Sequence, residues 1–227
     1  MPDQRFHLIL LGAPGAGKST QSRLLGHHFP LTVFATGQML RDEVVKGSAL
    51  GLLADSYFKT GTLLPDDVMI AIMTERLRAL PQTQGVLLDG FPRTCVQAEA
   101  LDKLLIELKR PLDAVIALDL SDEVAVHRLG GRRMCEGLGT PFALHIDDPE
   151  SIAACLRLGG NVTIRPDDEP EVIRERLRVY EAETEQLIDY YGGHGLLHRI
   201  SAAAAPETVH EQIVTLLGER HATVGGT

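Results

Sequence analysis

Short apolar runs alternate with longer, helix-like stretches along most of this chain. Five runs of mainly apolar residues are candidate buried strands: 6–11, 31–35, 86–89, 114–119 and 196–200. Between them apolar residues recur at a spacing near 3.6, as in Val68, Ile72 and Leu77, which is typical of helices with one buried face. Nearly continuous apolar strands alternating with helices predict a parallel sheet covered on both faces. We therefore expect an α/β fold, a three-layer, doubly wound sandwich around a five-stranded parallel sheet.

Two segments interrupt this alternation. Residues 36–80 have the pattern of two or three helices with no strand between them, whereas residues 131–168 are loop-like, rich in Gly, Pro and Asp and without a clear period. An irregular segment of this length inside a compact domain is usually functional or a small domain of its own. The last helix is expected to begin near Pro206 and to carry Val209, Ile213, Leu216 and Leu217.

The charge balance narrows the function classes. The chain has 227 residues, with 22 basic and 31 acidic side chains and a formal net charge of −9. That balance argues against a dedicated nucleic-acid-binding protein, which usually carries a basic face. Of the 22 basic residues 17 are arginine, the better two-pronged phosphate ligand, although genomic composition bias would explain the same excess.

No segment has the composition of a membrane span or a secretion signal. The longest stretch free of Asp, Glu, Lys and Arg, Leu24–Leu40, is interrupted by His27, His28 and Pro30. The first residues lack a basic region followed by a long apolar stretch, and three cysteines are too few for a disulfide scaffold. We therefore expect a soluble, cytoplasmic protein with no membrane partner.

A glycine-rich segment carries the strongest chemical signal. Residues 12–19, GAPGAGKS, match G-x-x-x-x-G-K-[ST], follow a predicted strand and open a predicted helix over 17–28. Glycines allow backbone amides to turn inward around phosphate oxygens, and the helix N-terminus adds positive potential. The lysine reaches the β- and γ-phosphates, and the serine hydroxyl is placed for Mg²⁺. The expected ATP-binding residues are Gly15, Ala16, Gly17, Lys18, Ser19 and Thr20.

A second segment indicates what accepts the phosphate. Residues 87–94, LLDGFPRT, end an apolar run at Asp89, where a carboxylate can hold the water shell of Mg²⁺ beside the glycine-rich turn. Arg93 and Gln97 follow at the same edge of the sheet. Together with residues 36–41, TGQMLR, this segment resembles the adenylate kinase family of nucleoside monophosphate kinases, over about residues 6–217.

The resemblance implies a division of the chain and roles for matched residues. It implies a core of residues 1–35, 65–130 and 169–227, a monophosphate-binding insertion over 36–64 and a lid over 131–168. The implied ATP contacts outside the glycine-rich turn are Arg128 and Arg132. The implied AMP contacts are Thr36, Arg41, Thr62, Leu63, Leu64, Gly90, Arg93, Gln97, Arg165 and Arg176. Arginines outside the motifs, such as Arg110, are expected to be solvated surface charges.

The implied reaction is reversible, Mg²⁺-dependent phosphoryl transfer from ATP to AMP, giving two ADP. Such transfer needs positioning and charge neutralisation rather than a covalent enzyme intermediate. The implied catalytic residues are Lys18, Asp89, Arg93, Arg132, Arg165 and Arg176, with Ser19 and Asp89 on the metal side. A kinase for UMP, CMP or GMP stays an alternative, as does an inactive nucleotide-binding regulator. We expect a monomer, because both insertions must move freely.

The lid segment departs from the family pattern. Many members carry two C-x-x-C pairs around a structural zinc, whereas the matching residues here are Cys135, Leu138, Cys155 and Leu158. Two sulfurs cannot supply the four ligands of a structural zinc site, so we expect no zinc and an apolar cluster of these residues. A bond between the two cysteines is within reach under oxidation but is not expected in cytoplasm.

Three further residues bear on metals. His145 or Asp147 could in principle complete a site with the lid cysteines, although the nine histidines show no spacing typical of a metal site. Gln38 stands where the family usually has Asp, which removes a carboxylate from the Mg²⁺ water shell. We therefore expect a higher Mg²⁺ requirement.

Overall fold

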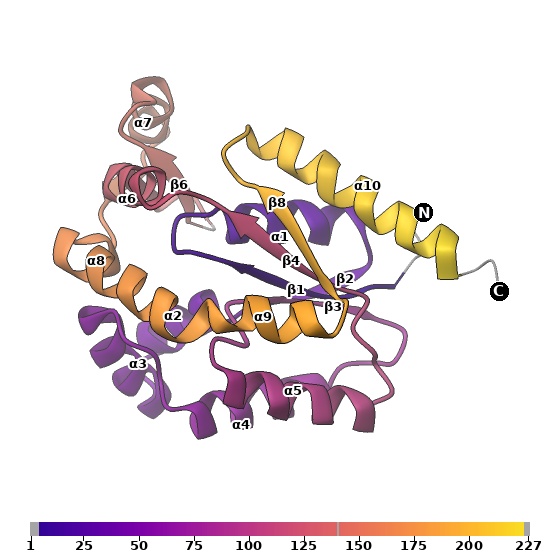
Figure 1. Cartoon of the computed structure of the whole chain (residues 1–227). Helices are drawn as coiled ribbons and strands as arrows, with labels where there is room; N and C mark the ends of the chain where they lie inside the picture. Colours follow the sequence, from indigo (N-terminus) through magenta and orange to yellow (C-terminus); the bar gives the residue numbers. More distant parts are fainter. Residues whose placement is uncertain (1–4, 140, 225–227) are drawn as a thin grey trace.

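The computed structural model describes residues 5–139 and 141–224, and a five-stranded parallel sheet lies at its centre (Figure 1). The strand order is β2-β3-β1-β4-β8. Each strand lies within one residue of a predicted apolar run: β1 (His7–Gly12), β2 (Leu31–Ala35), β3 (Gly85–Asp89), β4 (Ala114–Asp119) and β8 (Leu197–Ser201). The predicted α/β fold class is confirmed.

Helices cover both faces because neighbouring strand residues point in opposite directions. In β1, Ile9 and Leu11 join the core against α4 (Asp66–Arg78), α5 (Cys95–Glu107) and α9 (Gln186–Gly193). Leu8 and Leu10 join the other core, against α1 (Lys18–His28) and α10 (Pro206–Val224). Strands buried on both faces explain why the apolar runs are continuous rather than alternating.

The register of the sheet brings two chemical motifs together. β1 pairs with β3 so that Leu10 lies opposite Asp89, and β1 also pairs with β4. The carboxyl end of β1, where the glycine-rich turn begins, therefore lies beside the carboxyl end of β3. Ligands of open α/β sheets bind outside the carboxyl ends of the strands.

Two helices follow β2 as an antiparallel pair, α2 (Thr36–Lys46) and α3 (Ala49–Thr60). α2 ends at Gly47, whose φ of 66° lies in the left-handed region, and Ser48 caps α3 by accepting a hydrogen bond from the Gly51 amide. A Cβ at Gly51 would lie 2.0 Å from the carbonyl oxygen of Glu43, so only glycine allows the helices to approach this closely.

The segment expected to be irregular is a small folded unit. After α6 (Asp122–Gly131) come β5 (Arg132–Glu136), β6 (Phe142–His145), α7 (Pro149–Arg157) and β7 (Asn161–Thr163). The strands form an antiparallel sheet in the order β6-β5-β7, away from the main sheet in Figure 1. The prediction of a loop-like segment is wrong, because strands of three to five residues are too short to reveal a period.

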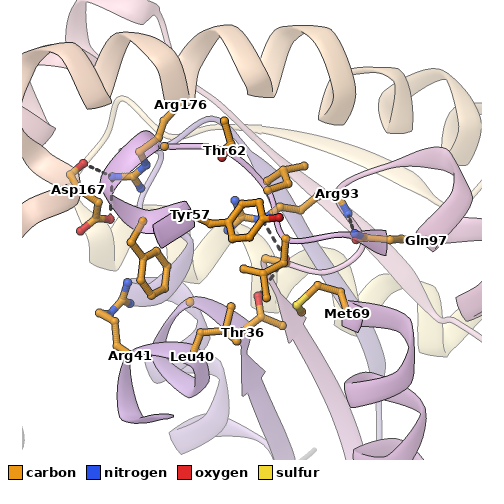
Figure 2. Close-up of a pocket in the computed structure, with 16 residues that line it drawn as sticks. Thr36, Leu40, Arg41, Tyr57, Thr62, Met69, Arg93, Gln97, Asp167 and Arg176 are labelled. Atoms are coloured by element: carbon orange, nitrogen blue, oxygen red, sulfur yellow. Dashed lines mark hydrogen bonds and ion pairs between the residues drawn. The ribbon is translucent and has the colours of Figure 1, made fainter. Parts of the chain in front are cut away.

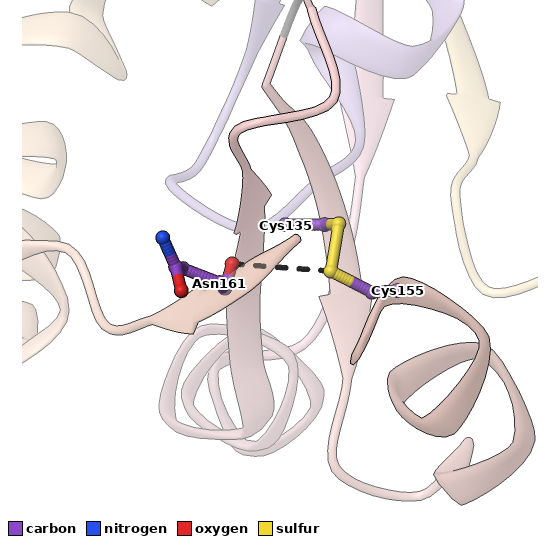
Figure 3. Close-up of a disulfide and its surroundings, with 3 residues drawn as sticks. All are labelled: Cys135, Cys155 and Asn161. Carbon is purple, nitrogen blue, oxygen red and sulfur yellow. Dashed lines mark hydrogen bonds between the residues drawn. A yellow bond between two sulfur atoms is a disulfide. The ribbon is translucent and has the colours of Figure 1, made fainter. Parts of the chain in front are cut away.

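A disulfide between Cys135 on β5 and Cys155 on α7 joins two parts of this unit (Figure 3). The Cα atoms are 6.0 Å apart, and both residues are buried. The sequence left this bond within reach under oxidation without expecting it in cytoplasm, and the structure contains it. The predicted four-residue apolar cluster is wrong, because Leu138 is 37% and Leu158 is 72% exposed.

One long helical segment runs along the molecule after the lid (Figure 1). The 3₁₀ turn η1 (Pro166–Asp168) precedes α8 (Pro170–Val179), which continues through the π-helical turn η2 (Tyr180–Thr184) into α9. α8 packs against α6 through Ile173 and Leu177. Among the described residues, none of the helices combines the length and the apolar character needed to cross a membrane.

Arg110 is fully buried, contrary to the prediction of a surface charge. Its guanidinium donates hydrogen bonds to the carbonyl oxygens of Gln84 (2.7 Å), Leu80 (2.9 Å) and Pro81 (2.7 Å). Three carbonyl acceptors compensate the buried cation, although burial still lowers the pKa of Arg110. The side chain ties the 80–84 loop, which leads into β3, to the segment between α5 and β4.

Candidate active site

The glycine-rich turn joins β1 to α1 and leaves a ring of backbone around the helix N-terminus. Gly15 and Gly17 have φ of 88° and 87°, a conformation that favours glycine. The first turn of α1 contains no acidic residue, so its free amides keep their positive potential. The arrangement fits a phosphate group.

Lys18 lies folded over this turn. Its Nζ donates hydrogen bonds to the carbonyl oxygens of Gly12 (2.5 Å) and Ala13 (3.0 Å). Burial, helped by the charges of Arg93, Arg176 and Arg132, lowers the pKa of Lys18 to about 8 against the opposing effect of Asp89. An anion bound here would relieve the repulsion between these cations.

Asp89 lies buried at the end of β3, beside the turn. Its Oδ2 accepts a hydrogen bond from the Ser22 hydroxyl at 3.1 Å, while its Oδ1 has no hydrogen-bond partner among the described residues. Asp89 and the exposed Ser19 both line the cavity above the turn. A carboxylate oxygen and a hydroxyl are ligand types that suit Mg²⁺, so the residues present fit this ion.

That cavity has a volume of about 750 Å³ and extends from the turn to the lid. All residues predicted on the ATP side line it, together with Asp89 and three more of the predicted catalytic arginines: Gly15, Ala16, Gly17, Lys18, Ser19, Thr20, Asp89, Arg93, Arg128, Arg132, Arg165 and Arg176. Arginines from the loop after β3, from α6, from the lid and from α8 thus surround this cavity. Arg128 is held by a hydrogen bond from its Nη2 to the Ala202 carbonyl at 2.9 Å.

A second pocket lies beside the first, between α2, α3 and the end of β3 (Figure 2). Its lining includes every residue predicted on the AMP side except Arg165, which lines the larger cavity: Thr36, Arg41, Thr62, Leu63, Leu64, Gly90, Arg93, Gln97 and Arg176. Tyr57, Phe58 and Met69 also line this pocket, and the sequence reasoning missed them. Apolar helix residues carry no signal that distinguishes a pocket wall from core.

Hydrogen bonds fix the floor of the second pocket. The Thr36 hydroxyl donates to the Gly90 carbonyl at 2.9 Å, and Arg93 Nε donates to the same oxygen at 2.9 Å. Gln97 Oε1 accepts from the Arg93 amide at 2.8 Å, and Gln97 Nε2 donates to Asp66 at 2.8 Å. A Cβ at Gly90, where φ is 84°, would lie 2.7 Å from the Thr36 hydroxyl oxygen.

The two pockets meet at Arg41, Arg93 and Arg176, which line both. Arg41 stacks its guanidinium over the Phe58 ring, 5.7 Å from the centroid. Burial and, to a smaller extent, the charge of Arg176 lower the pKa of Arg93 to about 10. Burial likewise lowers the pKa of Arg165 to about 10. Three cations therefore lie together where the two pockets meet.

Two acids that the sequence reasoning did not single out hold the arginines. Arg132 makes two hydrogen bonds to Asp168, from Nε at 2.7 Å and from Nη2 at 2.5 Å. Arg176 Nη1 contacts Asp167 Oδ2 at 3.0 Å and Asp168 Oδ1 at 3.4 Å. Burial opposes ionisation of Asp167, but the fields of Arg176, Arg41, Arg132 and Arg165 outweigh it and lower its pKa. The available signal was the pair of consecutive acids that follows Arg165 and Pro166.

A third group of polar side chains lies where α6 meets the lid. His127 on α6, His145 on β6 and Asp147 place their ligand atoms within 4.8 Å of one another, on the rim of the larger cavity. The histidines show no metal-site spacing along the sequence, as expected. In the folded chain, however, two of them lie together with an acid in a group that could hold a metal ion. The cluster involves neither cysteine of the lid, in contrast to the mixed site considered from the sequence.

Comparisons with known proteins agree with this geometry. The sequence model of the family described as "Adenylate kinase" matches residues 10–196. A protein of Archaeoglobus fulgidus named adenylate kinase is 42% identical over 212 residues, which cover 93% of this chain and 98% of that protein. An adenylate kinase of Caldicellulosiruptor bescii is 44% identical over 192 residues, covering 85% of this chain and 89% of the relative. The chain therefore belongs to the adenylate kinase family.

Proposed function

We propose that this chain catalyses reversible phosphoryl transfer from ATP to AMP, giving two ADP. The observation that carries the proposal is the junction of two pockets at Arg93 and Arg176, directly beside Lys18 and Asp89. The larger pocket contains the phosphate-binding turn. The smaller one has an apolar wall, which includes Phe58 and Met69, and polar side chains such as Arg93 and Gln97. Two nucleotides bound there would meet phosphate to phosphate.

In this proposal the donor occupies the larger cavity. The amides of residues 15–20 and Nζ of Lys18 bind the phosphates, for which Lys18 exchanges its carbonyl contacts with Gly12 and Ala13 for phosphate oxygens. Arg128 and Arg132 lie on the lid side of the donor. Bound Mg²⁺ would neutralise phosphate charge and would be held, largely through water, by Ser19 and Asp89.

The acceptor occupies the smaller pocket. Arg41 and Arg93 bind its phosphate, Thr36 and Gly90 shape the floor, and Thr62, Leu63, Leu64 and Gln97 surround the base. The carboxamide of Gln97 is engaged at both ends, by Arg93 and Asp66. Recognition of adenine through this side chain would therefore require one of those bonds to be shared or exchanged.

Arg132, Arg165 and Arg176 span both nucleotides. Asp167 and Asp168 hold two of them as ion pairs. Phosphate oxygens would compete for the same guanidinium groups, since both ligands accept two-pronged hydrogen bonds. Bringing these cations to the transferring group neutralises its equatorial oxygens, which is the main catalytic requirement of such transfer.

We also propose the division into a core (1–35, 65–130, 169–227), a monophosphate-binding insertion (36–64) and a lid (131–168). Residues 1–4, 140 and 225–227 of these ranges lie outside the described part of the structure. Closure of the two insertions would exclude water from the γ-phosphate. We further propose that the chain is a cytoplasmic monomer with Mg²⁺ as its cofactor and with no membrane or nucleic-acid partner. Cys135, Leu138, Cys155 and Leu158 would hold no zinc.

One assay separates the candidate functions. Purified chain with ATP and Mg²⁺ is given AMP, GMP, UMP or CMP in turn, and ADP formation is measured in a coupled reaction. We expect kcat/KM for AMP to exceed that for every other monophosphate. A preference for UMP, CMP or GMP would establish the alternative kinase, and no turnover with any acceptor would establish a nucleotide-binding regulator.

A further inference from the structure

We propose that His127, His145 and Asp147 form a binding site for a first-row transition-metal ion, such as Zn²⁺ or Co²⁺, between the core and the lid. His127 lies on α6 of the proposed core, whereas His145 and Asp147 belong to the lid. This site is separate from the Mg²⁺ site at Asp89 and from the lid cysteines. It does not depend on the proposed phosphoryl transfer.

The distances fit metal coordination. Asp147 Oδ2 lies 3.3 Å from His127 Nε2 and 3.3 Å from His145 Nδ1. Two ligands at about 2.1 Å from a tetrahedral zinc ion are separated by about 3.4 Å. All three ligand atoms lie within 4.8 Å of one another, so a small movement of exposed side chains would complete the set.

The surroundings of His145 hold its ring in a suitable orientation. Its Nε2 lies 3.3 Å from the carbonyl oxygen of His127, which favours a proton on Nε2 and leaves the Nδ1 lone pair facing Asp147. Metal-bound histidines typically donate their second ring nitrogen to such an acceptor. The Asp147 amide, 3.2 Å from Nδ1, would exchange this contact for water when a metal binds.

Local backbone explains why the two elements meet here. β5 pairs with β6 so that Arg132 lies opposite His145, and the Ile146 amide donates to the Gly131 carbonyl at 2.9 Å. A Cβ at Gly131 would lie 2.0 Å from His145 Nε2, so the ring occupies space that only glycine leaves free. α6 and β6 lie side by side in Figure 1, and a shared metal would tie them together.

The donor set selects the ion class. Two imidazoles and one carboxylate suit Zn²⁺, Co²⁺ or Ni²⁺, whereas Mg²⁺ and Ca²⁺ prefer all-oxygen sites. The exposed side chains of His127 and Asp147, each 62% exposed, make the site accessible from solvent and leave a coordination position for water.

The test uses the full chain, freed of metal by a chelator, with its disulfide intact and no nucleotide present. Co²⁺ is titrated in and followed by visible absorbance and calorimetry. We expect saturable binding of one ion per chain, no sulfur-to-metal charge-transfer band, and no competition from millimolar Mg²⁺. His127→Gln and Asp147→Asn should each weaken binding at least about tenfold.

The matched control is His28→Gln, which disrupts a different close imidazole pair, His28 and His210, 3.3 Å apart, and should leave Co²⁺ affinity unchanged. Zn²⁺ should also slow amide hydrogen exchange over 127–131 and 142–147 in the unaltered chain but not in His127→Gln. Absence of saturable binding, a thiolate band, or equal affinity in His127→Gln and the unaltered chain would each overturn the proposal.

Discussion

Asp168 is the residue whose removal should cost the nucleotide-free chain most among the acids of the cleft. Its carboxylate side chain is 1% exposed and accepts two hydrogen bonds from Arg132 and a longer one from Arg176. In Asp168→Asn, one carboxylate oxygen becomes an amide that can only donate, and it faces guanidinium groups that also only donate. One strong bond is lost, Arg132 loses its compensating charge, and Arg176 is left with Asp167 alone.

The magnitude follows from this geometry. Removing one partner of a buried ion pair costs about 3–5 kcal/mol, and one hydrogen bond to a charged group contributes about 1.5–3 kcal/mol. Arg132 and Arg176 keep 21% and 22% exposure, so water compensates part of the loss. We expect a loss of about 3 kcal/mol in the free energy of unfolding, equivalent to about 6–12 °C in Tm for a chain of this size.

Urea unfolding followed by far-UV circular dichroism measures this loss, since the chain has no tryptophan for fluorescence. The matched control is Asp67→Asn, an exposed acid in the first turn of α4, which should cost less than about 1 kcal/mol. If Asp168→Asn and Asp67→Asn unfold at the same urea concentration with equal m values, the reasoning about the buried pair is refuted.

Three further predictions concern the reaction. Arg93→Ala should lower kcat/KM for ATP and AMP at least about 100-fold while the circular dichroism spectrum is unchanged, and a loss below tenfold would remove Arg93 from the catalytic set. Because the pKa of Lys18 is about 8 and phosphate binding needs its protonated form, ATP affinity should fall about tenfold between pH 7 and pH 9. Lys18→Arg should abolish that pH dependence, and a decline that persists in the variant would assign it to another group. Gln38→Asp should lower the Mg²⁺ concentration that gives half-maximal rate. Gln38 donates a hydrogen bond to Asp42 at 2.8 Å, so the new carboxylate would be repelled by Asp42 by a few tenths of a kcal/mol, which is too little to reverse the effect. An unchanged Mg²⁺ titration would contradict the role assigned to position 38.

The main sheet and the glycine-rich turn could be predicted from the sequence because each is a local pattern. Five buried strands leave five continuous apolar runs, and residues 12–19 contain all the chemistry of a phosphate-binding turn within eight positions. Asp89 could be placed beside this turn because parallel strands share their carboxyl edge. These inferences needed only neighbouring residues and the rules of strand pairing.

The features that escaped prediction depend on contacts between distant positions. His127 and His145 are 18 residues apart and meet only because β6 returns against the end of α6. Cys135 and Cys155 meet because α7 packs beside β5's sheet, where their Cα atoms come within bonding range. An isolated charged residue such as Arg110 has no periodic pattern, so its burial could not be seen before the 80–84 loop was placed around it.

Arg110 affects a part of the molecule that it never touches. By holding the carbonyl oxygen of Gln84, it fixes the residue just before β3 begins, and β3 ends at Asp89. Four residue steps of about 3.3 Å separate Gly85 from Asp89, so the residue fixed by Arg110 and the carboxylate of Asp89 lie at opposite ends of a strand about 13 Å long. A substitution at Arg110 would be classed by distance as remote from the cleft. Its first effect on function would nevertheless be to displace the Asp89 carboxylate at the other end of β3.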